Sequence, residues 1–304
     1  MRLQCFGHRL HLAIENAVKN ESRVTRATKL CKELVGHFSH SWKKKTKLTD
    51  AQKELNLPEH TLITECQTRW GSRQKMVDRV LEQNKALNQV LSEDRKTRHL
   101  VPTWQDIKVL ESINSALKPL QEFTDILSGE EYVSVSYLKP VLHLLKSTTL
   151  AAKEEDTDLT KTIKSKIIAY LEKHYSDPAT RELLDVASLL NPRFKKDYIT
   201  SPENVTHIKE RVRAEMEEVV QTERRPQVSS DTGAMEKKGL RSLGSLLTKQ
   251  TLSVVVQVED IIEAELNSYL MAPVIAEESD PLAWWKIHSV NTKQTGQAPT
   301  VLCL

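Results

Sequence analysis

The sequence predicts a mostly α-helical fold. Its 304 residues include only 8 glycines and 11 prolines, and apolar residues recur at spacings of three and four through most of the chain. Hydrophobic residues make up 39 % of the chain and charged residues 28 %, which is typical of a folded protein with a sizeable core. We therefore expect long packed helices and not a turn-rich β structure.

Charge and cysteine content narrow the class of protein. The formal net charge of +3 is too small to indicate nucleic-acid binding by itself, so arguments about partners depend on local clusters. The 4 cysteines are widely spaced without a CxxC pair, which indicates a reducing compartment and no disulfide framework. No apolar run approaches the roughly 20 residues of a membrane span, and the N-terminal sequence lacks the apolar core of a signal peptide.

Two helices are predicted near the N-terminus, over residues 8–19 and about 22–38. Apolar residues at helical spacing mark both of them. Ser22 follows a break at Asn20 and Glu21, so it is the predicted N-cap of the second helix.

A tryptophan and a lysine run follow, and they have two interpretations. Trp42 with Lys43, Lys44 and Lys45 offers a stacking surface beside cations that neutralise phosphates, so these lysines are candidate DNA contacts. Alternatively, the lysines are the solvated end of the preceding helix, where they complement its C-terminal dipole. A separate short helix is predicted for residues 49–55, before Pro58.

Residues 64–91 form the segment around which the chain is organised. An irregular stretch, residues 68–72, leads into one long amphipathic helix whose apolar face carries Met76, Val80, Leu87 and Leu91. Trp70 stands where the stretch meets the helix. Its large flat side chain is either a core anchor or a probe that points into a site, and Trp70 and Arg69 are candidate DNA contacts.

A second long helix begins after Thr103, its predicted N-cap, with Asp106 at the third helical position. Its predicted core seam is Trp104, Ile107, Leu110, Leu117, Leu120 and Leu127. Pro119 should bend or break this helix. A further helix is expected over residues 137–153, with Pro140 in its first turn.

The C-terminal half is predicted from the same signals. A stripe of Leu159, Ile163, Ile167 and Leu171 marks one helix, another starts at Pro178, and residues 190–195 form a turn before a helix over 205–222. Residues 223–257 are rich in Ser, Thr, Gly and Lys without an apolar period, which predicts a mostly disordered linker. A helix containing Ile262 and Leu266 follows, and a last one has Asp280 as N-cap and Pro281 at its first position.

Four separated blocks of the chain, in order, resemble hAT-type DNA transposases and the BED-type zinc-finger proteins derived from them. They are Cys5-Phe6-Gly7-His8 with Leu10-His11-Leu12, then Thr68-Arg69-Trp70, then Asn191-Pro192-Arg193-Phe194-Lys195, and finally Asp280 to Lys286 preceded by Glu265-Leu266 and Tyr269-Leu270. Each block is weak alone, but together they span nearly the whole chain. Asn191 departs from the family, which usually has an aspartate there.

The resemblance implies an RNase H-like core, whose carboxylates hold two divalent metals, interrupted by a large helical insertion. The chain would be truncated at both ends and would hold that helical insertion domain with only fragments of the core. The implied division is a remnant of the core and entry helices (1–60), the helical insertion domain (61–222), a disordered linker (223–257) and a truncated C-terminal dimerisation segment (258–304).

The resemblance also assigns roles to individual residues. Cys5 and His8 match a Cys-x-x-His motif that follows the second catalytic aspartate, and Trp70 matches the tryptophan that handles a flipped base or hairpin intermediate. Asn191 and Arg193 belong to the third block, where a structural turn is expected, with Arg193 available for packing or pairing. The dimerisation residues are Leu266, Leu270, Leu282, Trp284 and Trp285.

Metal binding is a weaker interpretation of the first block. The spacing of Cys5, His8 and His11 allows a partial zinc site, but the fourth ligand would have to come from a distant part of the chain. We predict that these are structural residues and that the chain holds no metal. Zinc is expected only in a BED finger upstream of this sequence.

The implied function is that of a non-catalytic transcription regulator in the nucleus, associated with DNA or chromatin. The family's catalytic carboxylates would lie before Cys5 and after Trp285, outside this chain. The implied partners are a second copy of the chain, DNA and nuclear proteins, and no membrane. Two alternatives stay open: a DDE-type transposase whose catalytic acids lie outside this chain, and a helical protein-interaction scaffold. A steep loss of DNA affinity with salt would separate a DNA-binding protein from a scaffold.

Overall fold

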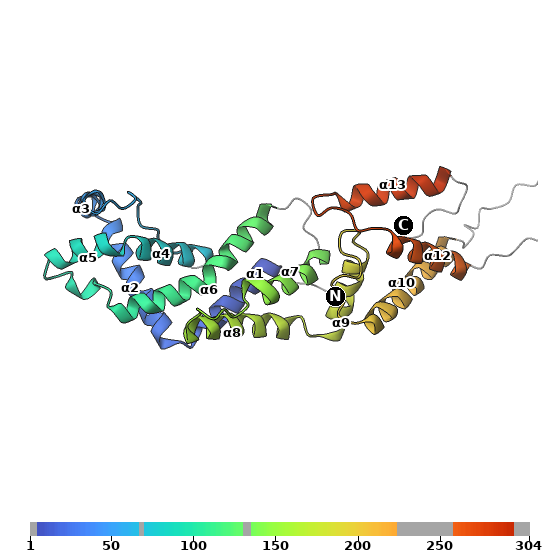
Figure 1. The fold of residues 1–304 in the computed structure, drawn as a ribbon, viewed down its shortest axis with the longest axis horizontal. Coiled ribbons are helices and arrows are strands. Elements are labelled where there is room, and N and C mark those ends of the chain that lie inside the picture. Colours follow the sequence, from blue (N-terminus) through green and yellow to red (C-terminus); the bar gives the residue numbers. More distant parts are fainter. Residues whose placement is uncertain (1–4, 67–69, 130–134, 224–257, 295–304) are drawn as a thin grey trace, which may run out of the picture. The chain divides into compact units, whose positions relative to one another are not determined.

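The computed structural model describes residues 5–66, 70–129, 135–223 and 258–294. Helices joined by turns and loops make up these ranges, and no strand occurs within them (Figure 1), so the mostly α-helical prediction is confirmed. The chain divides into two compact units, residues 1–181 (unit 1) and 182–304 (unit 2). The predicted division at residues 60, 222 and 257 is based on the family resemblance and not on contacts within the structure, and it stays a prediction.

Unit 1 is built around the long helix α6. Its helices are α1 (Phe6–Lys19), α2 (Ser22–Ser39), α3 (Trp42–Glu54), α4 (Trp70–Glu82), α5 (Asn84–Glu93), α6 (Trp104–Gly129), α7 (Leu138–Leu144) and α8 (Asp158–His174), with the short turns η1 (Arg98–Leu100), η2 (Val135–Tyr137) and η3 (Leu145–Thr149). Helix α6 packs against α2, α4 and α8, while α1 packs against α8 and α3 against α5 (Figure 1).

The middle of the predicted apolar seam of α6 lies in the core of unit 1, whereas Ile107 and Leu127 are only partly buried. Leu110, Leu117 and Leu120 are at most 1 % exposed, and burial of each such side chain contributes about 1.5–3 kcal/mol. Trp104 is 67 % exposed, so its predicted place in the core is wrong. It is the first residue of α6, and its ring lies 5.0 Å from the Lys108 ammonium. A cation–π contact at the surface therefore replaces core packing.

The start of α6 follows the predicted capping arrangement. The hydroxyl of Thr103 accepts a hydrogen bond from the backbone N–H of Asp106 at 3.2 Å, and the Asp106 carboxylate accepts one from the backbone N–H of Thr103 at 3.0 Å. Pro119 lies inside α6 and does not end it.

Three predicted boundaries are wrong. The N-cap of α2 is Glu21, not Ser22, which is already helical. The lysine run does not end a helix but begins α3, which also includes most of the short helix predicted for 49–55. The helix predicted over residues 137–153 is α7 followed by the π-helical turn η3, which ends at Thr149.

The long helix predicted after Trp70 is two helices, α4 and α5, that meet at Gln83. The Gln83 side chain is fully buried, accepts a hydrogen bond from the Gln52 amide at 2.9 Å and donates one to the Pro58 carbonyl at 3.0 Å. A buried amide must satisfy its donors and acceptor inside the protein. The break places Gln83 where Gln52 of α3 and the Pro58 loop can meet it.

Unit 2 has a small core of its own. The helix α9 (Pro178–Leu189) spans the boundary between the units, and unit 2 contains α10 (Pro202–Glu223), α12 (Val258–Met271) and α13 (Pro281–Gln294). Its buried residues are Leu189, Ile199, Ile208, Val212, Met216, Ile262, Leu266 and Tyr269. Asp280 caps α13 as predicted, since its carboxylate accepts a hydrogen bond from the Leu282 N–H at 2.8 Å.

Most of the predicted disordered linker, residues 224–257, lies outside the described residues. None of the described helices is long and apolar enough to cross a membrane. Cys5 and Cys66 are exposed, whereas Cys31 is buried, and burial raises the pKa of its thiol to about 12. Cys303 also lies outside the described residues.

Candidate nucleic-acid interface

An open pocket of about 480 Å³ lies where the start of α4 meets α1 and α6. Its lining comes from α1 (Gly7, His8, His11), from α4 (Trp70, Gly71, Ser72, Lys75) and from α6 (Gln121, Thr124). Trp70 is only 8 % exposed, so it is both a core anchor and a pocket wall. The structure thus brings together His8 and Trp70, which belong to separate blocks of the sequence. Arg69 lies outside the described residues.

A cluster of ion pairs holds the start of α4 in place. The guanidinium of Arg73 lies 2.6 Å from the Glu65 carboxylate and 2.8 Å from that of Glu15 on α1, while Lys32 on α2 lies 2.7 Å from Glu65. Only 4 % of the Glu65 side chain is exposed. The cluster therefore joins α1, α2 and α4 to the segment that precedes Trp70.

The cluster favours the ionised form of Glu65. Burial by itself would raise the pKa of its carboxyl, but hydrogen bonds from Lys32 and Arg73 outweigh burial and lower this pKa below its ordinary value. Burial opposes the charged form of Arg73 as well, yet its hydrogen bond to Glu65 and the charge of Glu15 raise the pKa of the guanidinium. Each charge in the cluster stabilises its neighbours.

The structure gives a role to Gly71 and Ser72, the two residues that follow Trp70. A Cβ atom at position 71 would overlap Oε1 of Gln121 on α6, so a larger residue would displace this amide from the pocket. The Ser72 hydroxyl accepts a hydrogen bond from the Cys66 N–H at 2.7 Å and donates one to the Cys66 carbonyl at 3.0 Å. Ser72 thereby fixes the preceding segment against the first turn of α4.

The pocket offers aromatic surface, positive charge and hydrogen-bonding groups together. The rings of His8 and His11 are stacked with centroids 6.5 Å apart, and Lys75 is exposed at the rim. The Nδ1 atom of His11 is buried and has no hydrogen-bond partner among the described residues, so a ligand or water can satisfy it. Within the described ranges no group of three or more His, Cys, Asp or Glu residues is arranged to hold a metal ion.

The lysine run does not line this pocket. Lys43, Lys44 and Lys45 lie in the first turns of α3, at the positive end of its dipole. The interpretation in which they complement a helix C-terminus is therefore wrong. Trp42 beside them is 80 % exposed.

The third sequence block forms a buried turn in unit 2. The side-chain carbonyl of Asn191 accepts hydrogen bonds from the backbone N–H and the Nε of Arg193, at 3.0 and 3.2 Å. Lys195, in the left-handed backbone region with φ of 46°, donates from Nζ to the carbonyls of Tyr269, Ala272 and Pro273 at 2.6, 2.5 and 3.4 Å. The turn therefore binds the C-terminal end of α12.

The residues assigned to dimerisation have different positions in unit 2. Leu266 is 2 % exposed in the core, and the Trp285 indole donates to the Leu190 carbonyl at 3.2 Å and lies 4.9 Å from the Tyr269 ring. Leu270 and Trp284 are partly buried against the same core, whereas Leu282 is 72 % exposed. Only Leu282 in this set has most of its side chain exposed.

Comparison with known proteins relates the chain to a family. The family model of the ZBED1 RNase-like helical domain matches residues 3–116. The human protein named Zinc finger BED domain-containing protein 4 is 28 % identical over 301 residues, which cover 95 % of this chain and 24 % of the relative. The chain is thus similar to a BED-type zinc-finger protein and, over residues 3–116, to an RNase-like helical domain. It spans about a quarter of the length of the curated relative it matches.

The similarity to an RNase-like helical domain agrees with the helical architecture. The matched range runs from α1 into the middle of α6, so it contains His8, Trp70 and the lysine run but none of unit 2. A helical domain of an RNase-like, hAT-derived protein is what the sequence predicted, and this fold class is confirmed.

Sequence reasoning missed several residues that build these sites. Glu15, on α1, and Glu65 and Arg73, which flank the irregular segment, look like ordinary surface residues in the sequence, so no role is predicted for them. Lys195 belongs to the third block but received no role. No pattern in the sequence marks this role, because its partners at and just after the end of α12 are distant in sequence.

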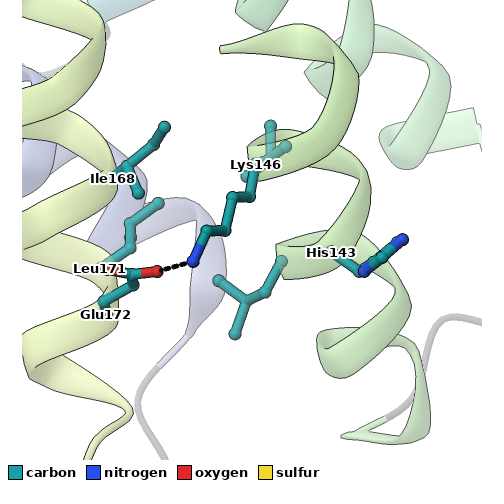
Figure 2. A pocket seen from close by; sticks show the side chains of 7 residues that line it. His143, Lys146, Ile168, Leu171 and Glu172 are labelled. Atoms are coloured by element: carbon teal, nitrogen blue, oxygen red, sulfur yellow. Dashed lines mark hydrogen bonds and ion pairs between the residues drawn. The ribbon is translucent and has the colours of Figure 1, made fainter. Parts of the chain in front are cut away.

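A second, smaller cavity of about 170 Å³ lies between α8 and the segment formed by α7 and η3. Figure 2 shows the Lys146 side chain extending toward Glu172 of α8, while His143 points away from this ion pair. The Nζ atom of Lys146 lies 2.6 Å from Oε1 of Glu172. The other lining residues are Leu142, Leu145, Ile168 and Leu171. We assign this cavity to imperfect packing beside the π-helical turn.

Proposed function

We propose that this chain is a non-catalytic, transposase-derived protein that associates with DNA and regulates transcription in the nucleus. The observation that carries the proposal is the Trp70 pocket in unit 1. It joins an indole wall to His8, His11 and the exposed Lys75. The relationship to hAT-derived proteins supports DNA as the ligand, because transposases act on DNA.

The groups in the pocket suit a nucleotide. An aromatic face can stack on a base, and cationic side chains contact phosphate, which fixes position without reading sequence. The amide of Gln121 and the unpartnered Nδ1 of His11 can bond to base edges or sugar.

The test compares DNA binding by the full chain and by the double variant His8→Gln/Lys75→Gln. Both side chains are exposed, so the fold should be kept. We expect weaker binding and a salt dependence whose slope falls by about 0.9 for each phosphate that is no longer neutralised. Lys161→Gln, an exposed lysine on α8 that lines neither cavity, is the matched control. Equal affinities for the double variant and the control would contradict a role for the pocket.

The non-catalytic part of the proposal has a separate test. Purified chain is incubated with supercoiled plasmid and with Mg²⁺ or Mn²⁺, the ions that two-metal nucleases use. We expect no strand cleavage or transfer. Nicking that depends on the metal and scales with the chain would favour the transposase alternative.

We also propose self-association through α13. Leu282 and Ile287 are 72 % and 59 % exposed on this helix, and apolar side chains of this size gain free energy when a partner covers them. Trp285 is assigned instead to internal packing, because it is hydrogen-bonded within unit 2.

A further inference from the structure

Unit 1 carries a second positively charged surface, which we call the basic surface. Two runs distant in sequence form it: one begins α3, and the other connects α5 to α6. All of its members are exposed except Lys44, which is half-buried; they are Trp42, Lys43, Lys44, Lys45, Arg95, Lys96, Arg98 and His99.

Specific contacts bring the two runs together. Lys47 of α3 lies 3.0 Å from the carboxylate of Glu93, the last residue of α5, at the start of the second run. The Lys44 ammonium lies 3.2 Å from Nδ1 of His37 on α2. Burial lowers the pKa of His37, and the charges of Lys44 and His99 lower it further against the opposing Asp94. His37 thus lies close to both runs.

The charges of the basic surface are largely uncompensated. Lys43, Lys45, Arg95 and Lys96 form no ion pair with any residue that the structure describes. The first turn of α3 has no acidic residue, and no side chain caps it. Lysines at the positive end of a helix dipole are unfavourable for stability, so folding alone does not account for them.

The exposed side chain of Trp42 indicates which kind of polyanion the basic surface binds. Its side chain is 80 % exposed among the cations, and a free indole face stacks on an unpaired base. In a duplex the base faces are covered by their neighbours, and an acidic peptide presents no such face. We infer that the basic surface binds single-stranded nucleic acid, with its cations on the phosphates and Trp42 stacked on a base. The inference rests on the proposed association with nucleic acid and adds a second contact surface and a preferred strand state.

The experiment measures binding of the full chain to a labelled oligothymidine of roughly 16 nucleotides and to a duplex of the same length. Trp42→Ala should weaken single-strand binding about 5- to 150-fold, the range of one stacked base, and leave duplex binding unchanged. Trp104→Ala is the matched control, because Trp104 is also largely exposed but begins α6.

A second variant tests whether the two runs act together. Arg95→Gln/Lys96→Gln/Arg98→Gln should weaken single-strand binding and reduce the salt slope by about 0.7 for each phosphate that is no longer neutralised. Equal single-strand affinity for Trp42→Ala and Trp104→Ala would overturn the inference, as would an unchanged affinity of the triple variant. If those variants have no effect while His8→Gln/Lys75→Gln still weakens DNA binding, the inference fails and the proposed function stands. If the chain binds neither the single-stranded nor the duplex probe at low salt, both the inference and the proposed association with DNA are wrong.

Discussion

Lys195 places a positive charge at the C-terminal end of α12. Its ammonium donates to the carbonyl of Tyr269 in the last turn and to those of Ala272 and Pro273 just after the helix, and the residue is only 2 % exposed. Unsatisfied carbonyls at a helix end carry partial negative charge, so a cation is stabilising at this position. Its left-handed backbone conformation, unusual for a residue with a Cβ atom, directs the side chain from the buried turn toward α12.

Lys195→Met should destabilise unit 2 by about 1.5–3 kcal/mol, the usual range for loss of hydrogen bonds to a charged group. The measurement is urea unfolding followed by fluorescence, with Lys196→Met as the control, because Lys196 is exposed beside it. Equal unfolding midpoints for the two variants would show that the carbonyls of α12 do not depend on Lys195.

At the scale of elements, the ion-pair cluster around Glu65 sets the position of α4. The cluster contains two carboxylates, from Glu15 and Glu65, and two cations, from Lys32 and Arg73, so its charges balance. Paired charges of this kind contribute little net stability, but the loss of one member leaves the others uncompensated. The contribution of the cluster should therefore depend on pH.

The sign of this dependence follows from the lowered pKa of Glu65. A carboxyl whose pKa is lower in the folded than in the unfolded protein stabilises the fold at every pH above its pKa in the unfolded protein. This contribution to stability disappears as the pH falls through the pKa of the folded protein. Glu65→Gln should cost about 2–3 kcal/mol at neutral pH. The difference in Tm from the parent chain should shrink as the pH falls below the ordinary carboxyl range.

Glu33→Gln is the matched control for this prediction. Glu33 is half-exposed and lies 3.8 Å from Lys29, and such surface pairs contribute at most about 1 kcal/mol. A Tm difference for Glu65→Gln that stays constant between neutral and acidic pH would show that Glu65 is not ionised in the fold.

At the scale of the whole molecule, the proposed self-association depends on which apolar side chains unit 2 leaves exposed. Leu282→Gln/Ile287→Gln should convert a dimer to a monomer without lowering the Tm, since both side chains are exposed. Light scattering gives the solution mass. Val219→Gln, at another exposed apolar residue on α10, serves for comparison. A monomeric parent chain would contradict self-association, and a dimeric double variant would place the interface elsewhere.

The sequence predicted the helices better than their ends and meeting points. Buried stripes such as Leu159 to Leu171 have a strict period, so the helix could be found. The lysine run has no apolar period, so nothing local showed that it begins α3. Gln83 looks like a surface residue in the pattern, yet it is buried against Gln52.

The sites were predictable only in part, because they depend on tertiary contacts. Trp70 and His8 were flagged by resemblance, but their shared pocket needs α1 and α4 to meet. The pairing of Glu65 with Lys32 and Arg73 likewise follows from packing. A contact between charged residues that are distant in the sequence produces no periodic pattern from which it could be predicted.

The hydrogen bonds of Lys195 at the end of α12 also affect what happens if the chain is cut by a protease. Tyr269 donates to the Leu189 carbonyl at 2.8 Å, and Trp285 donates to that of Leu190. None of these bonds requires the backbone between Glu223 and Val258. A protease cut within that stretch would therefore produce two fragments that stay associated and separate only in denaturant. The C-terminal helices would remain in place as a bound fragment.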